Sequence, residues 1–446
     1  MKRYDSYKDS GVEWMNKIPS NWEKSRIRMV GDLYGGLTGK KGSDFNDEDN
    51  SSNKPFVPFT NIFNNTYISK DHFQYVNVKE NENQNRVLKN DLFFLMSSES
   101  YEDLGKCSIL LEDVEELYLN SFCKGFRIKD SKVYPLFLNY QLLGSLHKEM
   151  ISIEGNGFTR INLRQDRLLD IPVFIPPLSE QQQIVSFLDT KTSLIDSLIE
   201  KTQRKIELLK EKRTSLINEV VTKGLNPNVK MKDSGVEWIG ETPSNWRTSK
   251  LGFYTTKIGS GSTPRGGSEV YVDSGIPFIR SQNVHFDGLK MENISHIEPE
   301  THQSMKGSTV IKDDVLLNIT GGSIGRCCVV KIEGEMNTNQ HVSIIRTTKN
   351  LLNIFLNYIL NSDVGQSQVV YNISGGNREG LTIEGIRDFR ITLPPLKEQQ
   401  QIVEYLDEQT GLMDKTISIE EKRIELLKEY RQSLISEVVT GKRKVV

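Results

Sequence analysis

Glycine-rich segments of this chain carry clusters of polar side chains whose types suit hydrogen bonding to another molecule. Arg, Lys, Asn and Gln can bond base edges in DNA, while Ser, Thr and backbone amides can bond phosphates. The first half of the chain contributes Lys40, Lys41, Ser43, Thr60, Asn61, Lys106, Thr159 and Arg160. The second half contributes Ser260, Ser262, Thr263, Arg265, Arg280, Ser281, Gln282, Asn283, Ser323, Arg326, Asn339, Gln340, His341, Asn377 and Arg378. If the chain binds DNA, these are the residues that we expect to contact it.

The chain as a whole is not basic, and its positive charge is gathered in local patches. There are 57 Lys and Arg against 59 Asp and Glu, which gives a formal net charge of −2. Residues 247–290 carry six basic and three acidic side chains, and residues 200–213 carry the same numbers, so each segment has a net charge of +3. Contact with a nucleic acid would therefore depend on such patches or on partners. The charged segment 200–213 could lie along DNA or against a partner.

Motifs for catalysis are missing from the sequence. The Asn/Asp-Pro-Pro-aromatic tetrapeptide of adenine methyltransferases does not occur, since both Pro-Pro pairs stand between apolar residues. The segment Gly35–Lys41 departs from a phosphate-binding loop in its glycine spacing, and Lys41 replaces the Ser or Thr that would hold magnesium. The six histidines and four cysteines lack the spacing of a metal or catalytic site. We therefore expect no catalysis, no metal and no cofactor in this chain, with reduced cysteines that serve packing.

Two copies of one pattern organise the elements that must position the polar clusters. The stretch "PPLSEQQQIVSFLD" at 176–189 returns as "PPLKEQQQIVEYLD" at 394–407, with 11 of 14 positions identical. An earlier lead, "KDSGVEWMNKIPSNW" at 8–22, returns at 232–246 with 11 of 15 positions identical. Gly, Pro and Asn surround Trp14, Trp22, Trp238 and Trp246 in these leads, so we expect irregular loops held by buried aromatic rings.

Between each lead and each repeated stretch lies a divergent middle, 23–175 and 247–393, and the two middles share a skeleton. "KNDLFFLMS" at Lys89 aligns with "KDDVLLNIT" at Lys312, and "FLNY" occurs at both Phe137 and Phe355. Short runs rich in β-formers are bounded by Gly, Pro, Asn and Asp, and a helix is expected around each "FLNY". Each middle is therefore predicted to be a mixed α/β globular domain whose loops differ between the copies.

Each repeated stretch opens a long predicted helix. Ser179 and Gln182 fit a capping box and Gly224 is placed to end the first helix, so this helix has about 44 residues and a length of ~66 Å. Its apolar residues follow a heptad made of Val185, Ile199, Ile206 and Val220 with Leu188, Ile195, Leu209 and Leu216. The second helix repeats this with Val403, Ile417, Ile424 and Val438 and with Leu406, Met413, Leu427 and Leu434, and breaks at Thr192 and Arg213 recur at Thr410 and Arg431.

Such a narrow apolar stripe must pack on something, and the nearest candidate is the other copy. The linker 224–231 is short, so the second lead must begin where the first helix ends, which favours an antiparallel coiled coil within one chain. The predicted fold class is thus mixed α/β (α+β), with two globular domains, two long helices and a pseudo-twofold repeat. The expected divisions are 1–175, 176–224, 225–393 and 394–446.

Two variable middles, two matching leads and two long helices that begin "PPL.EQQQIV" resemble the specificity subunits of type I restriction-modification enzymes. The resemblance covers almost the whole chain. It implies that each middle is a target recognition domain that reads one half of a bipartite, asymmetric DNA sequence. It also implies that the helices space the domains and dock two modification subunits that methylate adenine, and that restriction subunits add an ATP-dependent nuclease.

Other readings of the sequence stay open at this stage. A non-catalytic adaptor, whose coiled coil spaces two heads that bind proteins or ligands, would share the architecture and agrees with the near-neutral charge. A single-chain enzyme would need the motifs that are missing. No apolar run approaches the roughly eighteen residues of a membrane span and no apolar signal core follows Met1, so a cytoplasmic protein is expected.

Overall fold

The computed structural model describes residues 3–13, 15–46, 53–79, 81–373 and 380–445 of the protein. The chain divides into two compact units: Met1–Thr202 with Lys422–Val446 form unit 1, and Gln203–Glu421 form unit 2. Each unit therefore holds one globular part together with a portion of each long helix.

The two long helices are α6 (Leu178–Lys223) and α11 (Leu396–Val439). Gly224 follows α6 with a φ of +74°, a left-handed conformation that glycine adopts without a steric penalty, so it ends the helix as expected. The predicted heptad residues Val185, Leu188 and Ile206 are buried on α6, and Leu406 and Val438 are buried on α11. The two long amphipathic helices are therefore confirmed.

Unit 1 is built around an antiparallel sheet of four strands in the order β10 (Cys107–Ile109), β8 (Leu92–Leu95), β12 (Cys123–Ile128) and β4 (Gly31–Gly35). Side chains alternate along β8, so that Leu92 and Phe94 join one apolar core while Phe93 and Leu95 join another. Both faces of this sheet are buried, which explains why the strand reads as a continuous apolar run instead of an alternating one.

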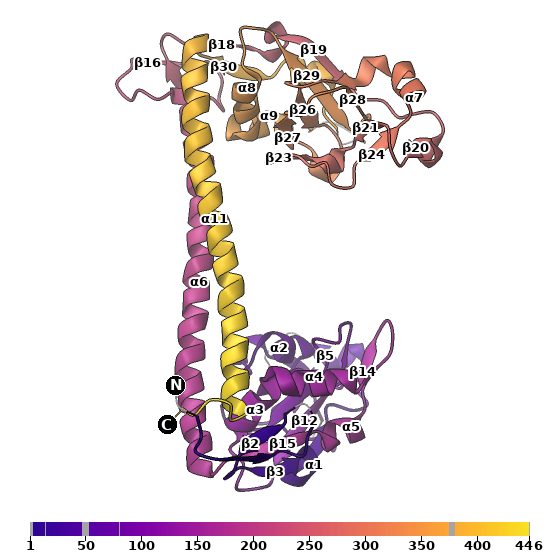
Figure 1. Ribbon diagram of the computed structural model, residues 1–446, viewed down its shortest axis with the longest axis vertical. Coiled ribbons are helices and arrows are strands. Elements are labelled where there is room, and N and C mark those ends of the chain that lie inside the picture. Colours follow the sequence, from indigo (N-terminus) through magenta and orange to yellow (C-terminus); the bar gives the residue numbers. More distant parts are fainter. Residues whose placement is uncertain (1–2, 14, 47–52, 80, 374–379, 446) are drawn as a thin grey trace. The chain divides into compact units, whose positions relative to one another are not determined.

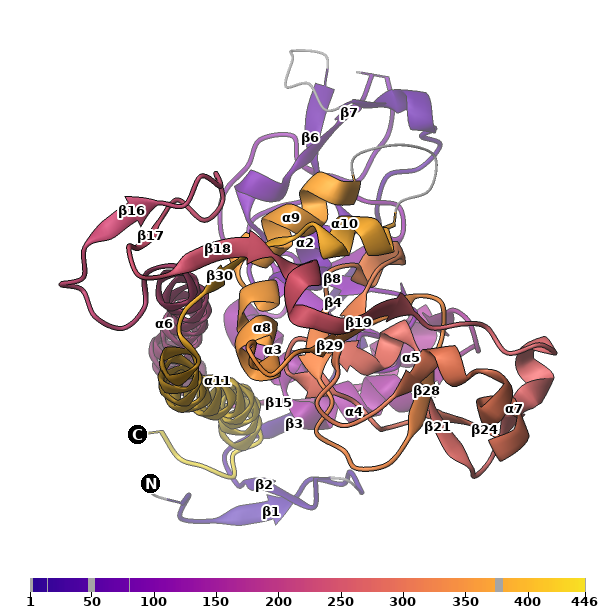
Figure 2. The same cartoon turned by 90° about the horizontal axis from the view of Figure 1, so that it is seen from above.

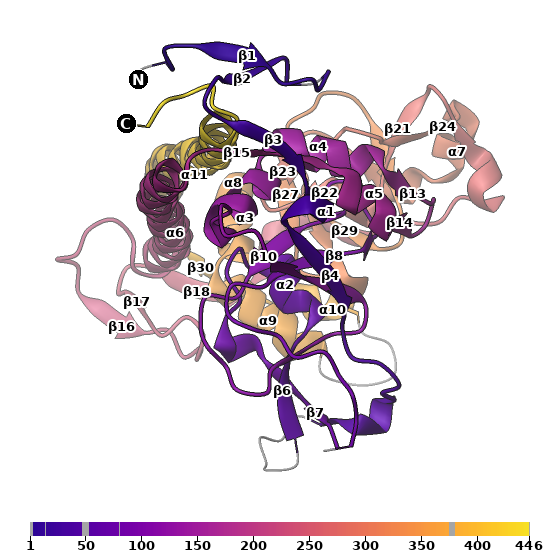
Figure 3. The same ribbon diagram turned by 90° about the horizontal axis from the view of Figure 1, so that it is seen from below.

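Helices and smaller sheets surround this sheet, and Figures 1 and 3 show that β6 and β7 extend away from it. A second sheet has the order β11 (Tyr118–Leu119), β6 (Asn53–Val57), β7 (Gln74–Asn77) and β5 (Phe45–Asn46). A third sheet has the order β13 (Gly155–Asn156), β14 (Ile161–Leu163) and β9 (Ser97–Ser98). Finally, β15 (Pro172–Ile175) pairs with β3 (Glu23–Arg26). The helices are α1 (Ile27–Val30), α2 (Phe59–Asn64), α3 (Pro135–Leu143), α4 (Ser145–Ile153) and α5 (Gln165–Asp170). The two ends of the chain lie side by side in this unit.

Unit 2 repeats the plan. Its central antiparallel sheet has the order β27 (Cys327–Val329), β26 (Val315–Asn318), β29 (Val342–Thr347) and β19 (Thr255–Ser260). A second sheet has the order β20 (Tyr271–Val272), β24 (Ser295–Ile297), β21 (Ile276–Ile279), β28 (Met336–Thr338) and β25 (Thr309–Val310). Two further pairs are β18 (Arg247–Lys250) with β30 (Arg390–Leu393) and β22 (Val284–His285) with β23 (Gly288–Leu289).

The helices of unit 2 are α7 (Pro299–Ser304), α8 (Asn353–Asn361), α9 (Asp363–Ile373) and α10 (Ile383–Arg387). Figure 2 looks along the long helices and shows β18 and β30 beside the end of α6, with α8 next to α11. The hydroxyl of Thr392 on β30 donates to the Val221 carbonyl of α6 at 2.6 Å. Helices at both "FLNY" segments and two mixed α/β domains confirm the predicted fold class.

Each lead forms a short hairpin, more regular than the loop that the sequence predicts. β1 (Tyr7–Asp9) pairs with β2 (Lys17–Pro19), and β16 (Met231–Asp233) pairs with β17 (Glu241–Pro243). Trp22 and Trp246 are fully buried just after these hairpins, whereas Trp238 is half-buried and Trp14 lies outside the described residues. Burial of the second tryptophan in each lead, Trp22 or Trp246, anchors the hairpin.

In both units the helices α6 and α11 run antiparallel. In unit 2, Lys205 Nζ pairs with Glu420 and Arg213 Nε pairs with Asp414 at 2.9 Å, so rising numbers on α6 meet falling numbers on α11. In unit 1, Arg431 Nε pairs with Asp196 at 2.9 Å. The predicted antiparallel pairing of the two copies is confirmed within each unit.

Two further sequence expectations concern the membrane and the cysteines. Across the part of the chain that the structure describes, no helix has both the length and the apolar character needed to cross a membrane. Cys107, Cys123, Cys327 and Cys328 are all buried and free of disulfides. Burial raises the pKa of the Cys123 thiol to about 12, so it packs as a neutral side chain.

Candidate nucleic-acid interface

The two units place their polar clusters on corresponding loops at one end of the central sheet. In unit 1 the backbone N–H of Asn120 donates to the Val57 carbonyl at 3.0 Å. In unit 2 the backbone N–H of Asn339 donates to the Ile279 carbonyl at 3.1 Å. The Leu163 amide donates to Met96 and the Leu381 amide to Ile319, each at 2.8 Å. Counting from these bonds, the corresponding positions are Phe59 and Ser281, Thr60 and Gln282, Asn61 and Asn283, Ser97 and Thr320, and Phe122 and His341.

In unit 2 the loop after β19 lies against the loop before β29. The Ser262 amide donates to the Thr338 carbonyl at 3.0 Å, and the Thr263 hydroxyl donates to the Gln340 side chain at 2.5 Å. A Cβ atom on Gly261 would lie 2.2 Å from the Thr338 carbonyl oxygen, so only glycine permits this approach. Residues about 77 positions apart in sequence are thereby brought together.

Asn318 joins the remaining loops of unit 2 to this cluster. Its side-chain amide donates to the Ser281 carbonyl at 2.8 Å and to the Ser323 hydroxyl at 3.1 Å. The next residue, Ile319, donates its backbone N–H to the His341 carbonyl at 3.0 Å. The predicted clusters around Ser262, Ser281, Ser323 and His341 therefore form one surface.

In unit 1 three of the predicted residues, Thr60, Thr159 and Arg160, line one hollow of about 710 Å³. The Arg160 guanidinium donates to the Ser97 hydroxyl at 3.0 Å and lies 5.6 Å from the centre of the Phe122 ring. Lys106 lies beside this hollow, with Nζ 4.3 Å from the centre of the Phe63 ring. The predicted residues of α2, of the β13–β14 hairpin and of the loop before β10 are thus neighbours.

The structure assigns Asn61 and Asn283 an internal role. Asn61 is 1% exposed, and its side-chain amide donates to the Ser69 carbonyl at 2.8 Å. Asn283 is 2% exposed, and its side-chain amide donates to the Lys290 carbonyl at 3.0 Å. Both asparagines satisfy backbone groups of the following loop, so neither is free to contact DNA and we withdraw both from the interface.

Lys40 is also engaged within the protein. Its side chain is 6% exposed, its Nζ donates to the Asn77 carbonyl and it forms an ion pair with Glu82. This lysine holds the pKa of the Glu82 carboxyl below its ordinary value. The ion pair neutralises this lysine, so it is not available to bind a phosphate. The neighbouring Lys41 and Ser43 are exposed.

The other predicted residues of unit 2 differ in exposure. Ser260, Arg265 and Gln282 are exposed, while Arg326 and Asn339 are half-buried. Arg280 is half-buried too, with its guanidinium carbon 5.9 Å from the centre of the Tyr271 ring. Asn377 and Arg378 lie outside the described residues.

The basic segment of α6 at residues 200–213 is largely neutralised. Within unit 2, Arg204, Lys205, Lys210 and Arg213 form ion pairs with Glu207, Glu420, Glu421 and Asp414, respectively. Four of the six basic side chains thus have carboxylate partners in the chain itself. This pairing weakens the case for this face as a binding surface for a DNA backbone.

A buried glutamine with matching hydrogen bonds in the two units fixes the start of each long helix. In unit 1, Gln181 accepts from the Tyr134 amide at 2.8 Å and donates to the Lys132 and Pro176 carbonyls. In unit 2, Gln399 accepts from the Leu352 amide at 2.9 Å and donates to the Asn350 and Pro394 carbonyls. Both glutamines are fully buried, so each locks its helix to the loop before the "FLNY" helix.

A tyrosine of each "FLNY" helix bonds a carboxylate on the long helix that it packs against. Tyr140 donates to Asp189 at 2.6 Å in unit 1, and Tyr358 donates to Asp407 at 2.6 Å in unit 2. Burial, reinforced by the bond to Asp189, raises the pKa of Tyr140 to about 12. These neutral hydroxyls explain why Thr192 and Thr410, which lie within 3.4 Å of them, interrupt the apolar heptad.

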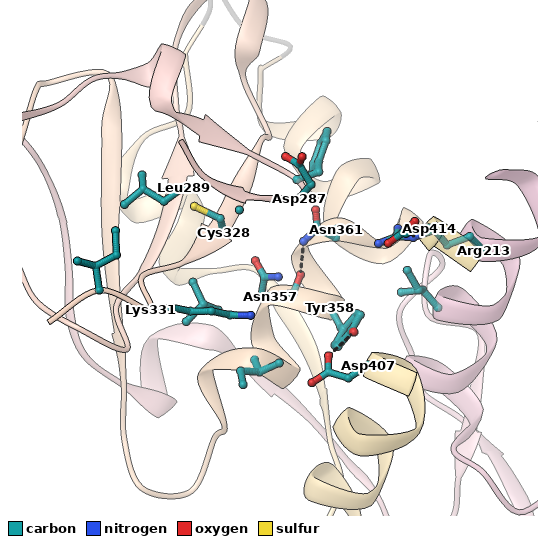
Figure 4. Close-up of a pocket in the computed structure, with 16 residues that line it drawn as sticks. Arg213, Asp287, Leu289, Cys328, Lys331, Asn357, Tyr358, Asn361, Asp407 and Asp414 are labelled. Atoms are coloured by element: carbon teal, nitrogen blue, oxygen red, sulfur yellow. Dashed lines mark hydrogen bonds and ion pairs between the residues drawn. The ribbon is translucent and has the colours of Figure 1, made fainter. Parts of the chain in front are cut away.

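Beside Asp407 and Tyr358 lies a pocket of about 420 Å³ (Figure 4). Figure 4 shows Asn357 and Asn361 of α8 on one side of it and the Arg213–Asp414 pair of the long helices beyond. In unit 1 the hydroxyl of Tyr67 donates to Asp189 at 2.7 Å at the corresponding place. The side-chain amides of Asn61 and Asn283 donate to the carbonyls of Ser69 and Lys290, so these two residues occupy corresponding positions. Tyr67 lies two residues before Ser69 and therefore corresponds to Gly288, which lines the pocket.

Sequence reasoning missed the aromatic residues of the unit 1 interface. Phe59, Phe63 and Phe122 line the hollow, and Phe158 at the tip of the β13–β14 hairpin is fully exposed. The available signal was an apolar ring set among polar loop residues, in "PFTNIF", "NSFCK" and "NGFTR". A search restricted to polar side chains cannot find stacking partners for bases.

Within the described ranges 3–13, 15–46, 53–79, 81–373 and 380–445, no group of three or more His, Cys, Asp or Glu residues could hold a metal ion.

Comparison with known families and proteins gives concordant results. The family model described as "Type I restriction modification DNA specificity domain" matches residues 19–208 and again residues 243–429. The specificity subunit of the type I restriction enzyme MjaVIII from Methanocaldococcus jannaschii is 26% identical over 449 residues, covering 98% of this chain and 97% of that protein. The repeated match coincides with the internal duplication.

Solved structures resemble the fold. A chain from a structure of complex assembly and conformational transition of the type I R-M system matches with a TM-score of 0.72 and 16% identity, over 96% of this chain and 99% of that one. The HsdS subunit from Thermoanaerobacter tengcongensis matches with a TM-score of 0.55 and 16% identity, over 96% and 98% of the two chains. At such identities the likeness concerns the fold.

Proposed function

This chain belongs to the family of type I restriction-modification DNA specificity domains, and from that premise we propose that each unit reads one half of a bipartite DNA sequence through its own loop cluster. The chain is a DNA-recognition subunit and not an enzyme. Adenine methylation and ATP-dependent cleavage would be performed by partner subunits, which the chain directs to their target.

The observation that carries this proposal is the convergence of separate polar segments in each unit. In unit 2 the segments around Ser262, Ser281, Ser323 and His341 are tied together by hydrogen bonds at the end of one sheet. In unit 1 Thr60, Thr159 and Arg160 share one hollow. Loops held on a rigid sheet are the usual place for recognition, because the scaffold stays fixed while loops vary.

The target sequence would be asymmetric because the two loop clusters differ in chemistry. Thr60 of unit 1 corresponds to Gln282 of unit 2, and Phe122 corresponds to His341. Gln commonly makes two hydrogen bonds to adenine, and neither Thr nor Phe can do so. Two halves read by such different groups would have different base sequences.

The partners of the chain are DNA and the other subunits of a type I restriction-modification complex. We propose that two modification subunits dock on the surfaces of α6 and α11, and that two restriction subunits join them. Exposed apolar residues on these helices, Leu194, Leu208, Leu412 and Leu426, supply contact area for such docking. A subunit that acts on cellular DNA would work in the cytoplasm.

Exchange of one recognition region tests the modular scheme. Residues 23–175 would be replaced by the matching region of a relative with a known target, and methylated adenines would be mapped across a genome that carries the hybrid. We expect one half of the recognised sequence to change and the other half to stay. The reciprocal hybrid, with residues 247–393 exchanged, is the matched control and should change only the other half.

A change in both halves after a single exchange would contradict independent reading by the two units. Binding to random duplexes, with the modification partner present and at several salt concentrations, separates DNA recognition from an adaptor role. Phosphate contacts make DNA binding weaken as salt rises. Binding without salt dependence and without a selected sequence would leave a non-catalytic adaptor as the better description.

A further inference from the structure

The aromatic hollow of unit 1, lined by Phe59, Thr60, Phe63, Ser97, Ser98, Glu99, Ser100, Asp103, Phe122, Thr159 and Arg160, has a chemistry of its own. Its volume of about 710 Å³ lies in the range of sites that enclose a small molecule, which is roughly 300–1,000 Å³. Phe59 and Phe63 stand one helical turn apart on α2, with ring centres 6.0 Å apart and an angle of 18° between the planes. The hollow therefore presents flat aromatic faces together with hydrogen-bonding groups.

The charges around the hollow argue against a phosphate as its occupant. Glu99 is exposed in the lining, and Asp103 accepts from the Ser100 hydroxyl at 2.8 Å. The two nearby cations are engaged at the hollow itself, since Arg160 donates to Ser97, and Lys106 lies over the Phe63 ring and pairs with Asp103 at 3.7 Å. Carboxylates repel phosphates, but they accept hydrogen bonds from the exocyclic amino group of a base.

We infer that the aromatic hollow of unit 1 binds a base that has left the DNA stack, and that this base is cytosine or adenine. The inference rests on the proposed function, because it requires unit 1 to face DNA. An unstacked base would find the phenylalanine rings as stacking surfaces and Glu99 as an acceptor for its amino group. Thymine fits less well because it has no exocyclic amino group, and guanine differs because its amino group lies on the minor-groove edge, whereas adenine and cytosine carry theirs on the major-groove edge.

Phe158 supplies the means of opening the stack. It lies at the tip of the β13–β14 hairpin, directly before Thr159 and Arg160 of the hollow, and its exposed fraction of 105% means that none of the described residues covers it. Gly157 has a φ of +136°, and a Cβ atom there would lie 2.1 Å from the Arg160 carbonyl oxygen, so the tip is a tight turn. Apolar side chains presented in this way separate base steps and kink the duplex.

The hairpin tip is held in place by its neighbours. The Tyr101 hydroxyl donates to the Gly157 carbonyl at 3.3 Å, and β14 pairs with β9, which carries Ser97 and Ser98. An exposed phenylalanine on a braced hairpin keeps its direction when it meets DNA. The wedge and the hollow thus belong to one rigid part of unit 1.

Fluorescent base analogues test the inference in the complex of this chain with its modification partner. Once the target sequence is mapped, 2-aminopurine replaces each adenine, and pyrrolocytosine replaces each cytosine, of the half-site read by unit 1, one position at a time. Neither analogue keeps the free amino group that Glu99 would bind, so these probes report unstacking alone. We expect a severalfold rise in fluorescence on binding at one position, because stacking quenches both analogues. Phe158→Ala should abolish this rise and lower affinity about tenfold, in line with the loss of one stacked contact.

Matched variants give the controls. Phe253→Ala removes another exposed phenylalanine, which belongs to unit 2, and should leave the signal intact. Phe158→Leu keeps an apolar wedge and should keep most of the signal. Glu99→Gln should shift preference away from amino-bearing bases at that position, without loss of the wedge effect.

Mismatched duplexes give a second, independent readout. A mismatch at the identified position makes extrusion easier and should tighten binding severalfold, whereas mismatches elsewhere in the half-site should weaken it. Normal sequence selection without any fluorescent position or tightening mismatch would overturn this inference and leave the proposed function standing. Failure to select any sequence would instead overturn the proposed function. A fluorescence rise that persists in Phe158→Ala would show that Phe158 is not the wedge.

Discussion

Units 1 and 2 share a frame, by which we mean the central sheet, the "FLNY" helix and the long helices. They differ in the side chains of the loops that this frame carries. The buried glutamines Gln181 and Gln399 make the same bonds to corresponding backbone groups, yet the loops at the end of each sheet carry different chemistry. Phe59 and Phe122 of unit 1 correspond to Ser281 and His341 of unit 2. Unit 1 therefore offers stacking surfaces where unit 2 offers hydrogen-bonding groups. A duplicated chain of this kind can vary what it recognises without altering how it folds.

The same contrast appears next to the long helices. Tyr67 of unit 1 bonds Asp189, whereas Gly288 at the corresponding place in unit 2 leaves a pocket beside Asp407. The aspartate and its "FLNY" tyrosine occur in both units. The shared fold therefore accepts either a tyrosine or an open pocket beside the aspartate. Changes made at matching positions of the two units can separate the parts that the frame requires from those that it tolerates.

The largest effect is expected at the buried aspartates that directly precede β8 and β26 of the central sheets. Asp314 is 1% exposed and receives two bonds from Arg346, and Asp91 is 2% exposed and receives two bonds from Arg127. Arg346→Met should destabilise unit 2 by about 3–5 kcal/mol, because it leaves a buried carboxylate without its cation. Arg127→Met should cost less, since the Tyr34 hydroxyl still donates to Asp91 at 2.6 Å.

Denaturant unfolding, followed by hydrogen exchange of β26 and β8 amides, measures the two losses. Tyr34→Phe together with Arg127→Met is the matched control and should bring the loss in unit 1 up to that of Arg346→Met. Equal losses from the two single variants would show that Tyr34 does not support Asp91.

The next effect depends on pH and belongs to unit 1. His147 is fully buried with Nε2 3.0 Å from the Pro172 carbonyl, and burial lowers its pKa to about 4. Because the folded state disfavours the charged form, the stability is complete above the ordinary pKa of about 6.5 and is lost as the pH falls towards 4. The loss in unit 1 should reach about 3 kcal/mol.

Unit 2 has Gly365 at the position that corresponds to His147, so it should not share this loss. Hydrogen exchange at pH 7 and pH 5, corrected for intrinsic rates, compares β12 of unit 1 with β29 of unit 2. Equal weakening of both strands at pH 5 would assign the acid sensitivity to groups other than His147.

A smaller effect is expected at the "FLNY" tyrosines. Tyr358→Phe removes the hydroxyl that donates to Asp407 and should cost about 1–3 kcal/mol, because an ionised carboxylate loses the hydroxyl donor of a buried tyrosine. Tyr140→Phe should cost about 1 kcal/mol or less, since Tyr67 continues to donate to Asp189. Thermal unfolding of both variants, with Tyr67→Phe combined with Tyr140→Phe as the control, tests whether Tyr67 accounts for the difference.

The frame of this protein could be predicted from the sequence because it is written twice. Repeated residues such as Gln181 and Gln399 or Thr192 and Thr410 mark positions where both copies need the same bond, and the heptad fixes the buried faces of the long helices. The loop chemistry could be predicted only in part. Polar type suggested Thr60 and Arg160, but it also suggested Asn61, whose side chain serves backbone groups of its own loop.

The stacking surface escaped prediction for a physical reason. An apolar ring such as Phe122 looks like a core residue in the sequence, and only the packing of the loops decides whether it is covered. Phe122 is 62% exposed while Phe126 on the same strand region is fully buried. Exposure is a property of the assembled loops, and the sequence of one loop does not contain it.

The smallest effect should be the same in both units. Arg431 pairs with Asp196 in unit 1 and Arg213 pairs with Asp414 in unit 2, in each case between the two long helices at 2.9 Å. Their carboxylates are about half exposed, so solvent screens each pair, and Arg431→Ala or Arg213→Ala should cost no more than about 1 kcal/mol. High salt should reduce both losses alike. If one variant cost several times more than the other, the pairing of α6 with α11 would differ between the units, and the frame would be less symmetric than the glutamine and tyrosine networks imply.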